Sequence, residues 1–64
     1  MKIFIERDNK RVRMKFAGRA SDLLKKIKIN KETVLIIKNN ELVDYDEMLS
    51  DNDDIKILSV VSGG

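Results

Sequence analysis

The sequence predicts an α+β fold in which a mixed sheet of four or five strands carries one helix on one face. Near the N-terminus, apolar residues alternate with polar ones, as in paired strands. Over residues 20–27 they recur instead at the three- and four-residue spacing of a helix. Because 64 residues allow a single domain, we expect this domain over residues 1–60 and a flexible tail over residues 61–64.

The N-terminal segment is predicted to form a β-hairpin. Lys2–Glu6 places Ile3 and Ile5 on one face of a strand. Arg7–Lys10 contains the Asp-Asn chemistry of a turn. Arg11–Phe16 then alternates basic with apolar residues, which predicts a second strand with its apolar side chains turned inward.

A helix is expected over Ala20–Ile27, with Leu23 and Leu24 on its apolar face. Its lysines suit the negative C-terminal end of a helix. Asn30 is the expected left-handed residue that stops it. The residue that caps its first turn is left open, because Ser21 has the right chemistry but would exclude Ala20 from the helix.

The second half of the chain supplies the remaining strands. Thr33–Lys38 is too short and too β-branched for a helix, so it is predicted to be a strand that is apolar on both faces. Leu42-Val43 is a short strand, Asp44–Leu49 a single helical turn, and Ile55–Val61 the last strand.

We expect the first and last strands to pair in parallel at the centre of the sheet. The predicted core comprises Ile3, Ile5, Val12, Met14, Phe16, Leu23, Leu24, Ile27, Ile36, Ile55 and Ile57.

Composition excludes much chemistry. The chain contains no Cys and no His, so thiolate catalysis, disulfides and the commonest metal ligands and general base are absent. A self-sufficient enzyme is not expected, and no metal or bound cofactor is expected either. No apolar run is long enough for a membrane span and the N-terminus is not a signal peptide, so we expect a cytoplasmic protein.

The acidic turn Asp51–Asp54 does not match a calcium loop. Counted from Asp51, the positions that require glycine and glutamate hold Lys56 and Ser62. Adjacent carboxylates on an exposed turn also lack the burial that would separate their pKa values for catalysis. We interpret the segment as a turn.

Charge is distributed unevenly. Residues 1–31 contain eleven Lys or Arg against three Asp or Glu, whereas residues 32–64 contain two against eight. The two halves attract each other when folded together, or the basic half presents a surface to nucleic acid or an acidic partner. Nucleic acid is the weaker interpretation, because Phe4 is the only aromatic candidate for base stacking beside the basic hairpin.

An apolar patch is predicted on the sheet face opposite the helix. If Val34 and Ile36 face the helix, alternation turns the neighbouring apolar residues outward, and such a patch in a small domain indicates a partner surface. The residues of the predicted partner-binding patch are Phe4, Leu35, Ile37, Leu58 and Val60.

The strongest functional feature is Gly63-Gly64 directly after a strand. Glycine passes where no bulkier residue fits, which suits a narrow enzyme channel that must reach the Gly64 carboxylate. Val61, Ser62 and Gly63 would enter that channel with it. Adenylation by ATP converts a carboxylate into a mixed anhydride that a sulfur or nitrogen nucleophile can attack, and the carrier itself needs no His, Cys or metal for this.

With these features the chain resembles the ubiquitin-like β-grasp family, and especially the small sulfur carriers of thiamin and molybdopterin biosynthesis. Leu23-Leu24 matches the carriers' Leu-Leu, and Asp51–Ile55 matches their turn before the last strand. Val61–Gly64 matches their apolar-small-Gly-Gly tail. Asn40 and Asn52 stand where the carriers have glycine, and Asn tolerates the left-handed backbone expected there.

The resemblance implies that Gly64 is adenylated by a ubiquitin-activating-type adenylyltransferase using ATP and magnesium. A sulfurtransferase would then convert it to a thiocarboxylate, and a downstream synthase would take the sulfur. Thiamin thiazole formation is favoured over molybdopterin. The alternatives are a protein modifier joined through Gly64 to target lysines and a nucleic-acid-binding module that uses the basic hairpin. The free protein is expected to be a monomer.

Overall fold

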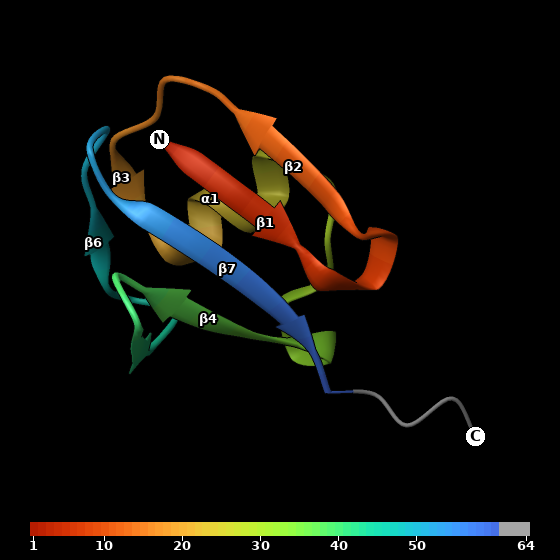
Figure 1. Cartoon of the computed structure of the whole chain (residues 1–64). Helices are drawn as coiled ribbons and strands as arrows, with labels where there is room; N and C mark the ends of the chain where they lie inside the picture. The colour runs from red at the N-terminus through yellow and green to blue at the C-terminus, as the bar shows by residue number, and fades with distance from the viewer. Residues whose placement is uncertain (61–64) are drawn as a thin grey trace.

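A computed structural model describes residues 1–60 of the chain (Figure 1). Five strands form the large sheet in the order β2-β1-β7-β4-β5. In that order they comprise Lys10–Arg13, Lys2–Ile5, Asp54–Ser59, Val34–Lys38 and Glu41–Val43. The central neighbours β1 and β7 are parallel, and the other pairs are antiparallel. The predicted mixed sheet, with its first and last strands paired in parallel, is confirmed.

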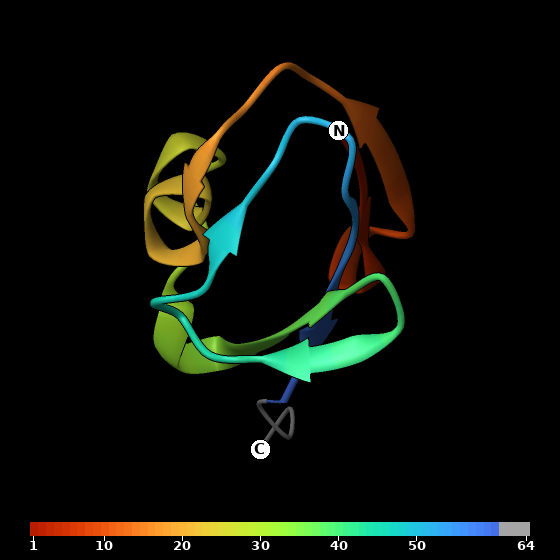
Figure 2. The same ribbon diagram turned by 90° about the vertical axis from the view of Figure 1, so that its left-hand side faces the viewer.

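The helix α1 comprises Ala20–Lys26 and lies against one face of this sheet. Beside it, β3 (Gly18–Arg19) and β6 (Met48–Leu49) form a small antiparallel sheet. Figure 2 shows the large sheet curving around the side of the molecule opposite α1, β3 and β6. Two short 3-10 helices, η1 (Glu6–Asp8) and η2 (Lys31–Thr33), precede β2 and β4.

The core lies between α1 and the large sheet. Its buried residues are Ile3, Ile5, Ala20, Leu23, Leu24, Ile29, Val34, Ile36, Leu49, Ile55 and Ile57. Seven of these belong to the predicted core. The other four predicted members, Val12, Met14, Phe16 and Ile27, are only partly buried and pack at the core's margin. Ala20, Ile29, Val34 and Leu49 are the buried core residues that the prediction omitted.

The second hairpin strand is shorter than predicted, because β2 ends at Arg13 rather than Phe16. Its partner β1 begins at Lys2, which pairs with Arg13, so no strand remains for the following residues to pair with. The backbone N–H of Met14 still donates to the carbonyl of Met1. The N–H of Phe16 donates instead to the Asp51 carboxylate. The predicted turn is confirmed, because η1 and Asn9, in the left-handed conformation (φ 47°), connect β1 to β2.

The prediction of a helical turn over residues 44–49 is wrong. Tyr45 and Asp46 instead form a turn, in which the Glu47 N–H donates to the carbonyl of Asp44, and the end of the segment forms β6. The reason is the start of α1, where the preceding residue Arg19 provides no side-chain cap. The N–H groups of Ala20 and Ser21 donate to the carbonyls of Glu47 and Tyr45, both at 2.9 Å. A loop distant in sequence therefore satisfies donors that a helix leaves unpaired.

The helix also ends differently from the prediction. Asn30 has a negative φ and caps η2, where its side chain accepts from the N–H of Glu32. Lys28 is the left-handed residue, with φ 60°. The N–H of Ile29 bonds to the carbonyl of Leu24 and that of Lys28 to the carbonyl of Lys25, which is the Schellman arrangement. It turns the chain so that Ile29 becomes buried.

Of the two asparagines expected in left-handed geometry, one adopts it. Asn40 has φ 71° in the turn between β4 and β5, beside Asn39 with φ 49°. Asn52 does not have a positive φ, so the turn before β7 needs no such residue there. That turn is held by carboxylate hydrogen bonds instead.

Candidate functional site

The face of the large sheet opposite α1 carries the predicted partner-binding patch. On β4, Val34 and Ile36 are buried against the core, so Leu35 and Ile37 turn to the open face. Leu35 is 39% exposed. Leu58 on β7 lies directly opposite Leu35. The structure therefore brings the apolar residues of β4 and β7 together on one surface.

A row of paired residues crosses this face through all five strands. In strand order the row is Arg11, Phe4, Lys56, Ile37 and Leu42. The predicted patch is thus not one continuous apolar area, because Lys56 stands between Phe4 and Ile37.

Leu42 was missed as a patch residue, although it is 63% exposed and pairs with Ile37. Its neighbour Val43 pairs with the buried Ile36 and packs against the core. Alternation on this two-residue run was the available signal, because one residue of Leu42-Val43 had to face outward once the other faced the core.

Two interactions fix the end of β7. The Ser59 N–H donates to Glu6 Oε1 at 3.2 Å, and the Val60 N–H donates to the carbonyl of Thr33 at 3.0 Å. Val60 is 48% exposed. The remaining predicted site residues, Val61, Ser62, Gly63 and Gly64, lie outside the described residues.

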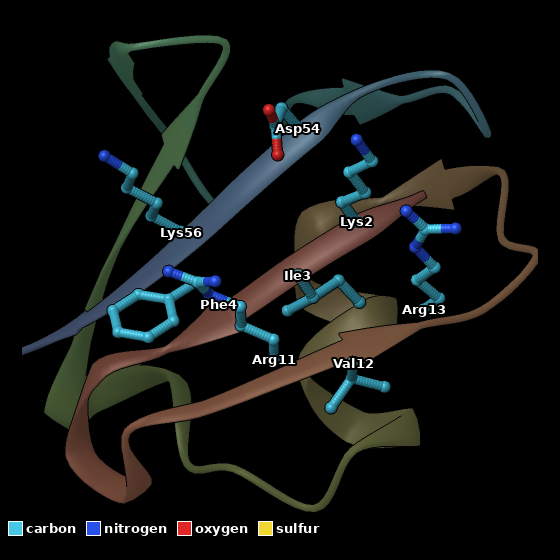
Figure 3. A pocket seen from close by; sticks show the side chains of 8 residues that line it. All are labelled: Lys2, Ile3, Phe4, Arg11, Val12, Arg13, Asp54 and Lys56. Carbon is cyan, nitrogen blue, oxygen red and sulfur yellow. The ribbon is translucent and has the colours of Figure 1, made fainter.

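A hollow on the open face is lined by side chains of β2, β1 and β7 (Figure 3). Its charged residues are Lys2, Arg11, Arg13, Lys56 and Asp54, and all five are exposed. The Arg11 guanidinium lies 5.9 Å from the centre of the Phe4 ring, close enough for a cation–π contact. Lys2 and Lys56 were not singled out from the sequence, and only strand pairing brings them beside Arg11 and Arg13.

The acidic turn before β7 is occupied by structural hydrogen bonds. Asp51 Oδ1 accepts from the Phe16 N–H at 3.0 Å and from the Met1 amino group at 3.3 Å. Asp53 accepts from the Ser50 N–H at 2.7 Å and from the Asn39 side chain at 3.1 Å. These bonds favour the ionised carboxylates, so they lower the pKa of Asp51 and the pKa of Asp53. The turn therefore anchors the start of β7.

Comparison with known proteins decides the family. The chain matches the model of the ThiS family over residues 5–64, a range that includes the terminal glycines. The chain belongs to the ThiS family. A relative of this ThiS family member, an uncharacterized protein of Archaeoglobus fulgidus, is 36% identical over 62 residues, which cover 95% of this chain and 91% of the relative.

Solved structures similar to this ThiS family member agree on the fold. One is the crystal structure of the thiamine biosynthesis protein ThiS from Geobacter metallireducens, with a TM-score of 0.66, 21% identity and full coverage of both chains. Another is a solution structure of a thiamine biosynthesis protein from the same organism, with a TM-score of 0.62 and 20% identity over this whole chain and 88% of the other. The ubiquitin-like β-grasp fold predicted from the sequence is confirmed. Within residues 1–60, no helix has the length and apolar character needed to cross a bilayer.

Proposed function

We propose that this ThiS family member is a sulfur carrier of thiamine biosynthesis whose Gly64 carboxylate bears the sulfur. The observation that carries the proposal is the family match, because it extends through Gly63-Gly64. The names of the similar solved structures support thiamine over molybdopterin biosynthesis. The chain would act as a protein co-substrate rather than as a catalyst.

The chemistry proceeds in two steps on partner enzymes. A ubiquitin-activating-type adenylyltransferase, with ATP and magnesium, joins AMP to the Gly64 carboxylate and releases pyrophosphate. A sulfide-equivalent nucleophile delivered by a sulfurtransferase then displaces AMP and leaves a thiocarboxylate. A downstream synthase takes up this sulfur. Residues 61–64 would form the tail that enters these enzymes, while residues 1–60 form the domain that docks on them.

The open face is proposed as the docking surface for these partners. Leu35, Leu42 and Val60 are exposed large apolar residues, and Leu58 lies opposite Leu35. Burying such side chains against a partner favours association by about 25 cal/mol per Å² of apolar surface removed from water. This surface belongs to the same sheet as β7, whose C-terminal end precedes the tail. A domain that docks through this surface would therefore have the start of its tail close to the channel.

The test is ATP–pyrophosphate exchange catalysed by the adenylyltransferase of the same organism. The intact chain should support exchange, and deletion of Gly63-Gly64 should abolish it while the unfolding free energy stays nearly unchanged. Gly63→Ala is a mild comparison variant, whereas Gly63→Val should fold normally and react poorly, because its branched side chain must enter the channel. Equal exchange with the intact and the tail-deleted chain would overturn the proposal.

Intact mass of the protein purified from its own cells distinguishes a carrier from a modifier. A carrier yields a species heavier by the exchange of one oxygen for one sulfur. Conjugates to other proteins, lost in a Gly64 deletion, would identify a modifier instead and would contradict the carrier assignment.

A further inference from the structure

The hollow on the open face combines four cations with a single carboxylate. Lys2, Arg11, Arg13 and Lys56 surround it, and Asp54 supplies the only negative charge among its lining residues. Among the ion pairs formed within residues 1–60, none involves any of these four cations. The basic hollow, defined by these four residues, therefore carries an excess of positive charge.

The basic hollow is continuous with the apolar part of the same face. Lys56 pairs with Phe4 on one side and with Ile37 on the other, so the hollow adjoins the apolar residues of β4 and β5 directly. A partner that covers Leu35, Leu42 and Leu58 cannot avoid approaching these cations. Their attraction to carboxylates of the partner is screened less where the docked surface excludes water and salt.

The surroundings of Phe4 favour a protein partner over nucleic acid. A protein that binds single-stranded RNA needs aromatic rings with free faces on which the bases can stack. Phe4 is half-buried and Arg11 lies over its ring, and no other aromatic residue lines the hollow. The adjoining apolar area offers nothing to a polyphosphate backbone, whereas a protein can match apolar residues on one side and carboxylates on the other.

We infer that the basic hollow receives an acidic segment of the adenylating enzyme, and that the apolar residues beside it contact an apolar area of the same enzyme. This rests on the proposed function and adds the chemistry of the partner's surface. Charge pairs of this kind chiefly raise the association rate and fix the docking orientation. They should therefore affect the KM for the carrier protein and its salt dependence, with little effect on kcat.

The experiment measures ATP–pyrophosphate exchange as a function of carrier concentration at low and at high ionic strength. The test variant is Arg11→Gln combined with Arg13→Gln. The matched control is Lys25→Gln combined with Lys26→Gln, which removes the same charge from exposed positions on α1, on the other side of the sheet. Circular dichroism verifies that both variants are folded.

At low salt the Arg11/Arg13 variant should raise KM about tenfold with kcat unchanged, and the difference should shrink at high salt because exposed charges are screened. The control variant should change KM less than about twofold, as surface charges distant from an interface do. Equal KM changes in the two variants, or none in either, would overturn the inference while leaving the proposed function intact.

Two further outcomes separate the remaining explanations. Absence of exchange with the unaltered chain would refute the proposed function and this inference with it. Fluorescence anisotropy of a labelled single-stranded oligouridylate measures whether the chain binds RNA. Tight RNA binding that is lost in the Arg11/Arg13 variant, together with an unchanged KM for exchange, would assign the hollow to nucleic acid and overturn the inference.

Discussion

At the scale of single residues, the backbone conformation of Lys28 determines how α1 ends. Its left-handed backbone (φ 60°) completes the turn that ends α1 and buries Ile29. A lysine in this conformation is strained by about 1–2 kcal/mol because its Cβ crowds the following carbonyl. Glycine lacks that Cβ, although it has more freedom to lose on folding.

Lys28→Gly should therefore raise the unfolding free energy by about 0.5–1 kcal/mol. Urea denaturation followed by circular dichroism measures it. The comparison variant is Asn30→Gly. Residue 30 has a negative φ, and the substitution removes the side chain that accepts from the Glu32 N–H, so this variant should have a lower unfolding free energy. A gain for Asn30→Gly with none for Lys28→Gly would contradict this account of the helix end.

The same residues show what the sequence could reveal locally. Asparagine's tolerance of left-handed geometry made Asn30 the natural choice for the helix stop, and that reasoning succeeds at Asn40. It fails at residue 30 because the stop is determined by where Ile29 can be buried. Burial of that side chain depends on the assembled core, which no local preference reports.

Asp53 allows a prediction of pH dependence. Hydrogen bonds from Ser50 and Asn39 lower the pKa of this carboxyl in the folded chain. The unfolded chain therefore binds its proton at higher pH, and stability is lost as pH falls through the folded pKa. The unfolding free energy should be constant above about pH 5 and should fall towards pH 2.

Asp53→Asn should be less stable at neutral pH and should lose less stability on acidification. Urea titrations at a series of pH values measure both effects. Asp46→Asn removes an exposed carboxylate in the loop before β6 and should retain the acid sensitivity of the original chain. An Asp53→Asn profile parallel to the original would remove Asp53 from the acid response.

At the scale of elements, the two faces of the large sheet have different roles: one packs against the core, and the open face is the proposed docking surface. Leu58 is half-buried there, opposite Leu35, and its neighbours Ile57 and Ile55 carry the core contacts of β7. Leu58→Asp should therefore keep the fold but raise the KM for the adenylating enzyme, because a charge would enter an apolar interface without a partner.

The control is Met48→Asp, which places the same charge on β6, where Met48 is 61% exposed. That variant should be activated normally. Pyrophosphate exchange measures both proteins after circular dichroism verifies their folds. Normal kinetics for a folded Leu58→Asp variant would exclude the patch from the docking surface.

The elements also mark the limit of sequence reasoning. Alternation predicted the strands and their inward faces well, because each strand faces one core. The segment over residues 44–49 has helical spacing in Tyr45, Met48 and Leu49, yet it forms a turn followed by β6. Its carbonyls accept hydrogen bonds from the first N–H groups of α1, a requirement set by a distant element. The candidate site follows the same division: the outward apolar residues of β4 and β7 were predicted, whereas Leu42 was missed and the hollow required the strand order.

At the scale of the whole molecule, stability depends on the core, which within residues 1–60 comprises eleven buried residues. A chain of this length has a total stability of roughly 3–10 kcal/mol. Leu24 is 1% exposed at the centre of that core. Leu24→Ala should lower the unfolding free energy by about 2–5 kcal/mol, enough to leave the protein marginally folded.

Urea denaturation of Leu24→Ala measures this loss, with Lys25→Ala, an exposed neighbour on the same helix, as the control that should change little. If urea alone is too harsh for the variant, added sucrose extends the folded baseline. A loss below about 1 kcal/mol would mean that the helix is not packed as described.

The central position of β7 determines when the domain can exist at all. This strand lies between β1 and β4, which have no other common neighbour in the sheet, and it is the last strand of residues 1–60 to be synthesised. Within the large sheet, a nascent chain that ends before Asp54 can pair only β1 with β2 and β4 with β5, and isolated hairpins are marginal in water. Folding must therefore wait for the last strand, and its long-range pairing makes it slower than that of a helical protein of equal length. No partner that recognises the assembled sheet face can engage the chain before translation has passed that strand.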